Sequence, residues 1–140
     1  MYRVLLPVDE DVERGLTQAR TVANLPHANE SVEALVLHVF QDDDRMDPGS
    51  DDRSPPDVES VREARSFLDE QGVDTEVLAD RNDPIEAILD QAADHDVDAI
   101  VIGGRKRSPA GKVLFGSVSH SVLMNTDTPV ILTGVANGEG

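Results

Sequence analysis

The hydrophobic positions along the chain fall into short continuous runs and longer stretches with helical spacing. Continuous apolar runs are typical of strands buried on both faces, and apolar residues three or four positions apart are typical of helices that bury one face. The runs predict five strands, at Arg3–Val8, Val32–Phe40, Thr75–Ala79, Asp98–Gly104 and Thr128–Gly134. The periodic stretches predict four helices, at residues 10–25, 58–72, 83–97 and 117–125.

Two helix boundaries can be predicted from single residues. Asp83 can cap a helix start, and Pro84 suits the first helical position, where its missing N–H has no partner to lose. Gly72 is typical of a residue that ends a helix. The sequence therefore predicts one helix that ends near residue 72 and another that begins after residue 83.

The first helix has a less regular pattern. Its apolar residues Val12, Leu16, Ala19 and Ala23 recur at helical spacing, so we expect these four to face the core. The segment Asn24–Ser31 that follows has the composition of a turn, and no helix is expected within it.

Strands that alternate with helices predict an α/β domain, in which helices cover both faces of a parallel sheet. The length suits one domain spanning residues 1–140. Residues 41–57 lack periodicity and are rich in aspartate, so we predict an acidic, mobile loop there. Residues 134–140 are predicted to be a frayed tail. The periodicity leaves the order of the strands open.

Charge narrows the classes of function. The chain has 28 acidic and 12 basic residues, a net charge of −16, and no cysteine. This balance resembles that of proteins from halophilic organisms, whose carboxylate-rich surfaces stay hydrated in a salt-loaded cytoplasm. It argues against a nucleic-acid partner, because phosphate contacts need a basic face. The N-terminus lacks the pattern of a signal peptide or membrane span, so we expect a cytoplasmic protein without a membrane partner.

Residues 101–122, VIGGRKRSPAGKVLFGSVSHSV, depart from this acidic background. They hold four of the 12 basic residues and four of the 10 glycines, with no acidic residue between Asp98 and Asp127. Ligands of open α/β sheets bind beyond the strand ends, where glycines admit close approach and a helix N-terminus offers free N–H groups. The window therefore predicts an anion site, most directly for phosphate, with Arg105 and Arg107 as supporting cations.

The same window resembles the nucleotide motif of the universal stress proteins, G-x2-G-x9-G-[ST]. Gly103, Gly116 and Ser117 match its first glycine, last glycine and hydroxyl residue, and Lys106 stands in place of its second glycine. The runs VLLPVD, LHV, GSVSHSVL and TPVIL match other marks of the family in the expected order. The resemblance thus extends over Tyr2–Leu132.

This resemblance implies an open five-stranded parallel sheet in the order 3-2-1-4-5, similar to that of the adenine-nucleotide α-hydrolases. Its switch point would lie between strands one and four. The resemblance also implies a homodimer through Val130, Ile131 and Leu132, and a cofactor that is either ATP with Mg²⁺ or Mn²⁺ or none. The positions matching the nucleotide contacts of the family are Pro7, Val8, Asp9, Val39, Ile102, Gly103, Lys106, Gly116, Ser117, Val118 and Ser119.

Two departures from the family leave the ligand open. The Lys106 side chain either obstructs a phosphate or clamps it, and the carboxylates of Asp9–Asp11 repel a triphosphate unless a metal ion intervenes. One hypothesis is a dimeric stress-response regulator that binds ATP or another phosphorylated ligand. The alternative is a protein-interaction module that does not bind ATP and uses the degenerate glycine loop for partner contacts.

An enzyme is the least favoured class. Apart from Asp9, no nucleophile or general base can be identified, so we expect at most slow ATP hydrolysis and predict no catalytic residue. No spacing of acidic residues and histidines is typical of a metal site. His38 lies in an apolar strand, so we expect it to be a packed core residue rather than a base.

Overall fold

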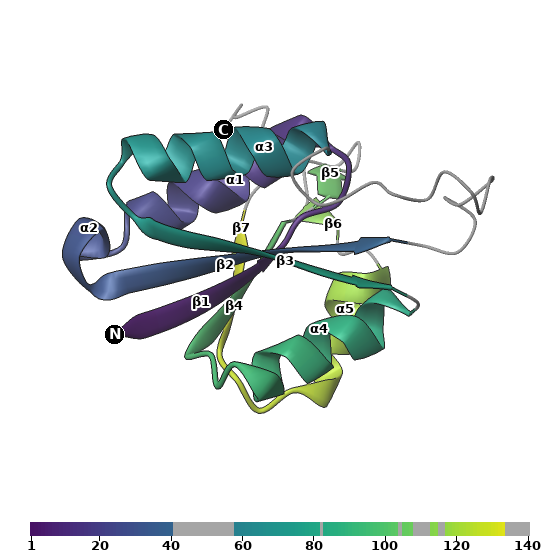
Figure 1. Cartoon of the computed structure of the whole chain (residues 1–140). Helices are drawn as coiled ribbons and strands as arrows, with labels where there is room; N and C mark the ends of the chain where they lie inside the picture. Colours follow the sequence, from purple (N-terminus) through teal and green to yellow (C-terminus); the bar gives the residue numbers. More distant parts are fainter. Residues whose placement is uncertain (41–57, 82, 104, 108–112, 115–116, 134–140) are drawn as a thin grey trace, which may run out of the picture.

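The computed structural model describes residues 1–40, 58–81, 83–103, 105–107, 113–114 and 117–133 (Figure 1). Its elements, in chain order, are β1 (Tyr2–Pro7), α1 (Val12–Ala23), α2 (Ala28–Ser31), β2 (Val32–Phe40), α3 (Glu59–Glu70), β3 (Asp74–Arg81), α4 (Pro84–Asp94), β4 (Ala99–Gly103), β5 (Arg105–Arg107), β6 (Val113–Leu114), α5 (Ser117–Asn125) and β7 (Val130–Thr133). The segments predicted as an acidic loop and a frayed tail lie outside the described residues. No helix in the described ranges is long and apolar enough to cross a membrane.

Five strands form one parallel sheet in the order β3-β2-β1-β4-β7. The central strand β1 pairs with β2 from Tyr2↔Val32 to Pro7↔Leu37, and with β4 at Val4↔Ala99. The chain moves outward from β1 to β2 and β3, then crosses to the other side of β1 to form β4 and β7. The predicted order 3-2-1-4-5 is confirmed, with β7 as the fifth strand, and the order reverses between β1 and β4.

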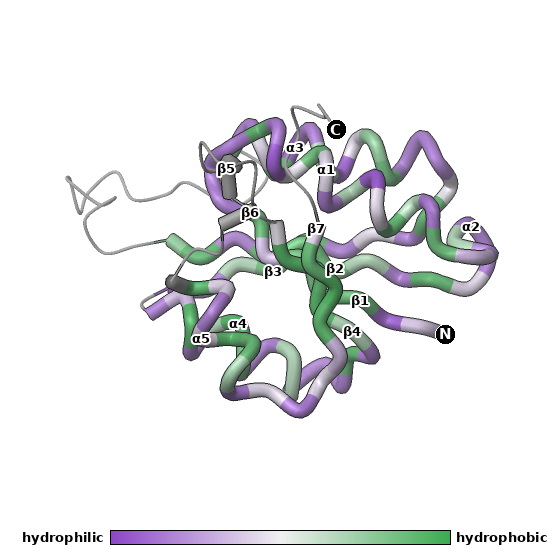
Figure 2. The backbone as a smooth tube through the Cα atoms, turned by 180° about the vertical axis from the view of Figure 1, so that it is seen from behind, coloured by the Kyte–Doolittle hydropathy of each residue, from purple (hydrophilic) through white to green (hydrophobic). Residues whose placement is uncertain are grey.

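Helices cover both faces of this sheet, as the continuous apolar strands predict. Helices α1 and α3 lie on one face, and α4 and α5 lie on the other (Figure 1). Alternation along β1 supplies both layers, because Val4 and Leu6 pack beneath α1 and α3 while Leu5 packs toward Ile88 of α4. Figure 2 shows the strands as largely hydrophobic segments between helices of mixed character.

Both predicted helix boundaries are confirmed. The Asp83 side chain accepts a hydrogen bond from the Ile85 N–H at 3.2 Å, and Pro84 is the first residue of α4. Helix α3 ends before Gly72, which has a φ of +79° and donates its N–H to the Asp69 carbonyl at 3.0 Å. This left-handed conformation suits glycine, which has no Cβ to clash.

The buried face of α1 differs from the prediction. Gly15, Gln18, Ala19 and Val22 are its buried residues, so only Ala19 of the four predicted positions is fully covered. The helix passes close to the segment after β1 at Gly15, where an added Cβ would lie 3.1 Å from Val8 Cγ1. A pattern of large apolar residues misses this contact because a glycine and a glutamine form part of the interface.

Two further elements were not expected. The predicted turn Asn24–Ser31 contains the short helix α2, whose Ala28 is buried in the core beside α1, so tertiary packing overrides turn composition there. In the glycine-rich window, β5 and β6 form an antiparallel pair with Arg105 opposite Leu114 and Arg107 opposite Val113. The predicted strand Val32–Phe40 coincides with β2, and the ends of the other four predicted strands differ from the structure by one or two residues.

Candidate functional site

A pocket of about 190 Å³ opens at the carboxyl ends of β1, β2 and β4, where the strand order reverses. Side chains from α1, α4 and α5 complete it. This is the position at which open α/β sheets bind ligands. The pocket is lined by Pro7, Val8, Asp9, Arg14, Gln18, Leu37, Val39, Pro84, Ile88, Ile102, Gly103, Val118 and Ser119.

One side of the pocket is hydrophobic. We call Leu37, Val39, Ile88, Ile102 and Val118 the apolar wall; they come from β2, α4, β4 and α5. All five also belong to the core cluster on the α4 and α5 face of the sheet, either within it or packed against it. The wall is therefore the open end of a packed core, and it suits a flat, uncharged chemical group.

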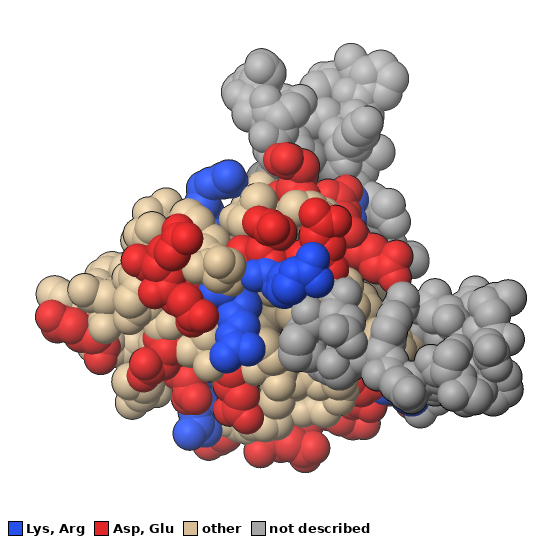
Figure 3. All heavy atoms as spheres, turned by 45° about the horizontal axis from the view of Figure 1, so that its top comes forward, with Lys and Arg blue, Asp and Glu red and all other residues tan. Residues whose placement is uncertain are grey.

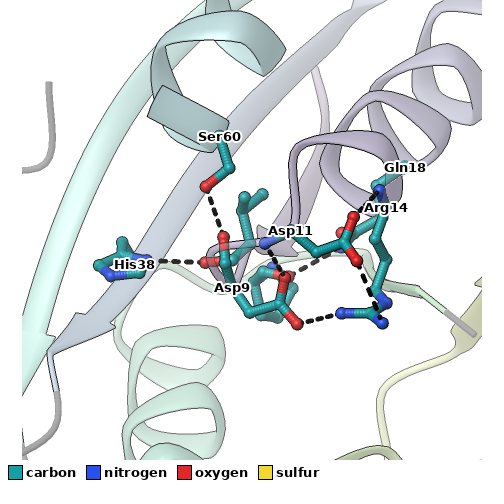
Figure 4. A network of polar contacts seen from close by, with 8 residues as sticks. Asp9, Asp11, Arg14, Gln18, His38 and Ser60 are labelled. Atoms are coloured by element: carbon teal, nitrogen blue, oxygen red, sulfur yellow. Dashed lines mark hydrogen bonds and ion pairs between the residues drawn. The ribbon is translucent and has the colours of Figure 1, made fainter. Parts of the chain in front are cut away.

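The polar lining residues come from the start of the chain and from α5. We call Asp9, Arg14, Gln18 and Ser119 the polar rim. The Arg14 guanidinium forms an ion pair with the Asp9 carboxylate and lies 3.6 Å from an Asp11 carboxylate oxygen (Figure 4). Asp9 accepts a hydrogen bond from the Asp11 N–H at 2.9 Å, and Asp11 caps α1 by accepting from the Arg14 N–H at 3.0 Å. The acidic turn after β1 is thus held in place by its own hydrogen bonds and by Arg14.

Gln18 connects the two strands at the switch point. Its side-chain amide donates one hydrogen bond to the Pro7 carbonyl of β1 at 2.8 Å and another to the Val101 carbonyl of β4 at 2.9 Å. Gln18 itself is 1% exposed, so its amide depends on these two carbonyls rather than on solvent for its hydrogen bonds. Gln18 therefore fixes the spacing of β1 and β4 at the base of the pocket.

The next two carbonyls after Pro7 are also bonded by side chains. The Val8 carbonyl lies 2.8 Å from His38 Nδ1, and the Asp9 carbonyl accepts from the Ser60 hydroxyl (Figure 4). A carbonyl only accepts, so His38 must donate from Nδ1. The His38 ring is 3% exposed and packs edge-on against Phe40 with centroids 4.7 Å apart, which confirms the prediction of a core histidine.

Eight of the eleven residues predicted to contact a nucleotide line this one pocket: Pro7, Val8, Asp9, Val39, Ile102, Gly103, Val118 and Ser119. Gly116 lies outside the described residues. Lys106 belongs to β5 and Ser117 begins α5, but their side chains, like those of Arg105 and Arg107, are not among those described. The nucleotide contacts of all eleven residues, and the supporting roles of Arg105 and Arg107, stay predictions.

Five residues that the sequence did not predict also line the pocket: Arg14, Gln18, Leu37, Pro84 and Ile88. Leu37 lies two residues before Val39, so the alternation of a strand would have placed it on the same face. For Gln18, the available signal was a polar residue between the small residues of a buried helix face. Arg14 carried no comparable signal.

Two other predicted features can be located. Val130, Ile131 and Leu132 lie in β7, one of the two edge strands of the described sheet, and are half-buried. Within the described ranges, no group of three or more histidine, aspartate and glutamate side chains is arranged to hold a metal ion.

Comparison with known proteins identifies the family. Residues 1–134 match the profile of the Universal stress protein family. The chain belongs to this family. Among its curated relatives, the Bacillus subtilis stress response protein NhaX is 36% identical over 74 residues, which cover 53% of this chain and 45% of that protein. A universal stress protein from Mycolicibacterium smegmatis is 33% identical over 72 residues, 51% of this chain and 55% of that protein. The matched segments thus span about half the length of these relatives.

Solved structures resemble this universal stress protein over nearly its whole length. A universal stress protein from Archaeoglobus fulgidus is 31% identical with a TM-score of 0.70, covering 95% of this chain and 98% of that one. A structure of the universal stress protein from Archaeoglobus fulgidus in complex with dAMP is 26% identical with a TM-score of 0.66 and the same coverage. An Arabidopsis thaliana family member with AMP bound is 18% identical, covers 100% of this chain and 97% of its own, and shares the fold with a TM-score of 0.69.

Proposed function

We propose that this universal stress protein binds an adenine nucleotide, or another phosphorylated nucleoside, in the pocket between β1 and β4. We propose further that it acts as a homodimeric regulator of the stress response. The observation that carries the proposal is the division of one pocket into an apolar wall and a polar rim. A nucleotide has the same division, with a flat base at one end and a charged sugar phosphate at the other.

A solved relative favours a mononucleotide as the ligand. The Archaeoglobus fulgidus relative that is 26% identical was solved in complex with dAMP. AMP is therefore the first ligand to test, and ATP the second.

The described residues do not favour a protein-built metal site. Magnesium in nucleotide sites is usually held by one or two carboxylates together with the phosphates. Asp9 is the one carboxylate among the described lining residues, and Arg14 already pairs with it. The proposal therefore assigns no Mg²⁺ or Mn²⁺ to the protein itself.

We propose binding without substantial catalysis. A hydroxyl nucleophile needs a base beside it, and Asp9, the one carboxylate of the described lining, is paired with Arg14. Ser119 is the one hydroxyl residue among the described lining side chains, which include no histidine, cysteine or lysine. We expect at most slow ATP hydrolysis, which phosphate release in the presence of ATP and Mg²⁺ would measure. Release at an ordinary enzyme's rate, about 1 s⁻¹ or more, would contradict this proposal.

Isothermal titration calorimetry with AMP, dAMP, adenosine and ATP tests the binding proposal, with and without Mg²⁺. We expect one AMP per chain and a stabilisation of about 2.7 kcal/mol when AMP is present at a hundred times its dissociation constant. The chain has no tryptophan and one tyrosine, so a retained adenine would dominate its ultraviolet absorbance. If none of these ligands binds, the proposal is wrong, and the interaction module that does not bind ATP becomes the better hypothesis.

The homodimer is proposed to form through β7. This strand pairs with β4 and ends the sheet, so its outer edge can receive a second copy of the chain. Sedimentation velocity should show a dimer that dissociates in the variant Ile131→Lys, because a charge would be buried without a partner. A dimer that survives this change, in a variant that remains folded, would place the interface elsewhere.

Adaptation to high salt is proposed from the surface charge. Figure 3 shows acidic side chains spread over the described surface of one face, with fewer basic ones between them. Raising KCl from about 0.1 M to about 1 M shortens the screening distance from about 10 Å to about 3 Å. It should therefore raise the urea midpoint of unfolding by weakening repulsion. An unchanged or lower midpoint would contradict the adaptation.

A further inference from the structure

Arg14 brings a positive charge to the acidic side of the pocket. Among the described lining residues it is the one cation, and its guanidinium lies beside the Asp9 and Asp11 carboxylates (Figure 4). The side chains of Asp9 and Asp11 are 56% and 46% exposed, whereas that of Arg14 is 23% exposed. The charge of the carboxylates predicted to repel a phosphate is therefore partly offset by a better-covered cation that lines the pocket.

The stem of Arg14 lies close against the end of β4. A Cβ added to Gly103 would lie 2.8 Å from Arg14 Cδ and closer still to Cγ, so only glycine leaves room for the stem there. The guanidinium is fixed from the other end by Asp9 and Asp11. Arg14 is thus positioned before any ligand arrives, which lowers the entropy that binding must otherwise overcome. In this chain the first glycine of the motif has a specific structural task.

We propose that Arg14 is the specificity-determining residue that makes this pocket prefer a phosphorylated nucleoside to the free nucleoside. This inference rests on the proposed nucleotide binding. An arginine fork binds phosphate oxygens through parallel N–H donors. The phosphate exchanges with Asp11, whose ion pair at 3.6 Å is long, while Asp9 continues to orient the fork. The base rests against the apolar wall in both ligands, so Arg14 acts only on the phosphorylated one.

A purely structural Arg14 would behave differently. If the residue only held the turn after β1 against β4, its loss would weaken the binding of adenosine and AMP together. If it recognises phosphate, its loss weakens AMP alone. The ratio of the two affinities therefore separates the two roles, whatever happens to overall stability.

The first experiment measures this ratio by calorimetry in Arg14→Gln. We expect AMP affinity to fall about tenfold, the size of one lost charge-assisted contact, while adenosine affinity changes less than about twofold. Arg20→Gln is the matched control, because Arg20 is an exposed arginine in the last turn of the same helix and lines no part of the pocket. Arg14→Lys keeps the charge and loses the fork, so its AMP affinity should fall between those of the wild type and Arg14→Gln. If Arg14→Gln does not fold, the same measurement on Arg14→Lys provides the test.

The second experiment uses Gly103 to move the same side chain. Gly103→Ala should lower the preference for AMP because the new Cβ displaces the Arg14 stem. The Gln18 side-chain oxygen also lies 3.3 Å from that Cβ, so adenosine affinity and stability are measured in parallel. In an Arg14→Gln background, Gly103→Ala should have little further effect on the preference. Additive effects on the preference would show that the two residues act independently and would contradict the positioning of Arg14 by Gly103.

The outcomes separate this inference from the proposed function. If the wild type binds AMP, and Arg14→Gln and Arg14→Lys retain its preference for AMP over adenosine, the role of Arg14 is wrong and the nucleotide site stands. If the wild type binds neither ligand, both proposals are wrong. A tenfold loss confined to AMP, absent in Arg20→Gln, supports both.

Discussion

The apolar wall and the polar rim share one pocket but are held in place by different forces. The five residues of the wall extend the core beneath α4 and α5, so close packing positions them. The rim depends on individual polar partners: Gln18 bonds two carbonyls, and Arg14 pairs with two carboxylates. The wall residues are therefore positioned together by packing, whereas each rim residue is positioned by its own polar contacts.

This difference predicts how each side responds to substitution. A packed core tolerates hydrophobic changes that conserve volume, usually at a cost below about 1.5 kcal/mol. A buried hydrogen-bonding group left without its partner costs about 1–3 kcal/mol, and no neighbouring group takes over. We therefore expect conservative substitutions in the wall to be tolerated and a charged substitution there to be damaging. In the rim, we expect each single substitution to be damaging by itself.

The largest effect is expected at Gln18. Gln18→Leu leaves the Pro7 and Val101 carbonyls without the hydrogen bonds that the buried Gln18 amide donates to them. Two such losses should lower the free energy of unfolding by about 4 kcal/mol. Urea denaturation followed by circular dichroism measures this change.

Gln91→Leu is the control for this prediction. Gln91 is a half-buried glutamine of α4, and its amide donates one hydrogen bond to an Asp80 carboxylate oxygen at 3.0 Å. Its loss should cost about 1 kcal/mol or less. Equal losses in the two variants would mean that the bridge between β1 and β4 gives no special stability.

A smaller effect, on binding, is expected when a charge is placed in the wall. Val39→Asp puts a carboxylate against the surface proposed to hold the base, and Val39 is only half-buried, so the fold should survive. Removing that charge from water under a ligand costs about 3 kcal/mol or more, which corresponds to a hundredfold loss of affinity. Calorimetry should show the loss for adenosine and AMP alike.

Val77→Asp provides the comparison. Val77 is a half-buried valine of β3 that packs against the core cluster on the opposite face of the sheet. The same substitution there should leave both affinities within about twofold. If Val39→Asp weakens only AMP, the wall does not hold the base, and the division of the pocket is wrong.

The fold could largely be predicted because hydrophobic spacing reports local structure. Parallel strands buried on both faces leave continuous runs such as Val32–Phe40, and their alternation with helices indicates the layers. The strand order has no such local signal and came from the family resemblance. The β5–β6 pair was missed because Arg105–Arg107 is a short, charged strand without an alternating pattern.

The candidate site, like the fold, could be predicted from the sequence only in part. Val39, Ile102 and Val118 of the wall were predicted because they occupy positions that match the family. Arg14 and Gln18 were not, because their roles depend on contacts with residues distant in sequence: Gly103 for one and Val101 for the other. The role of a polar residue on a buried helix face can be recognised only once the strands that it contacts are known.

The smallest expected effect is a salt dependence confined to AMP. Raising KCl from about 0.1 M to about 1 M should increase AMP affinity about threefold and leave adenosine affinity nearly unchanged. The reason is the net charge of −16, which repels a phosphate over distances that salt screens well, whereas the partly covered contact with Arg14 is screened less. The increase should persist in Arg14→Gln because it comes from the whole surface. If AMP affinity falls with salt in the wild type and not in Arg14→Gln, the local ion pair outweighs the acidic surface, and the rim alone governs the response to salt.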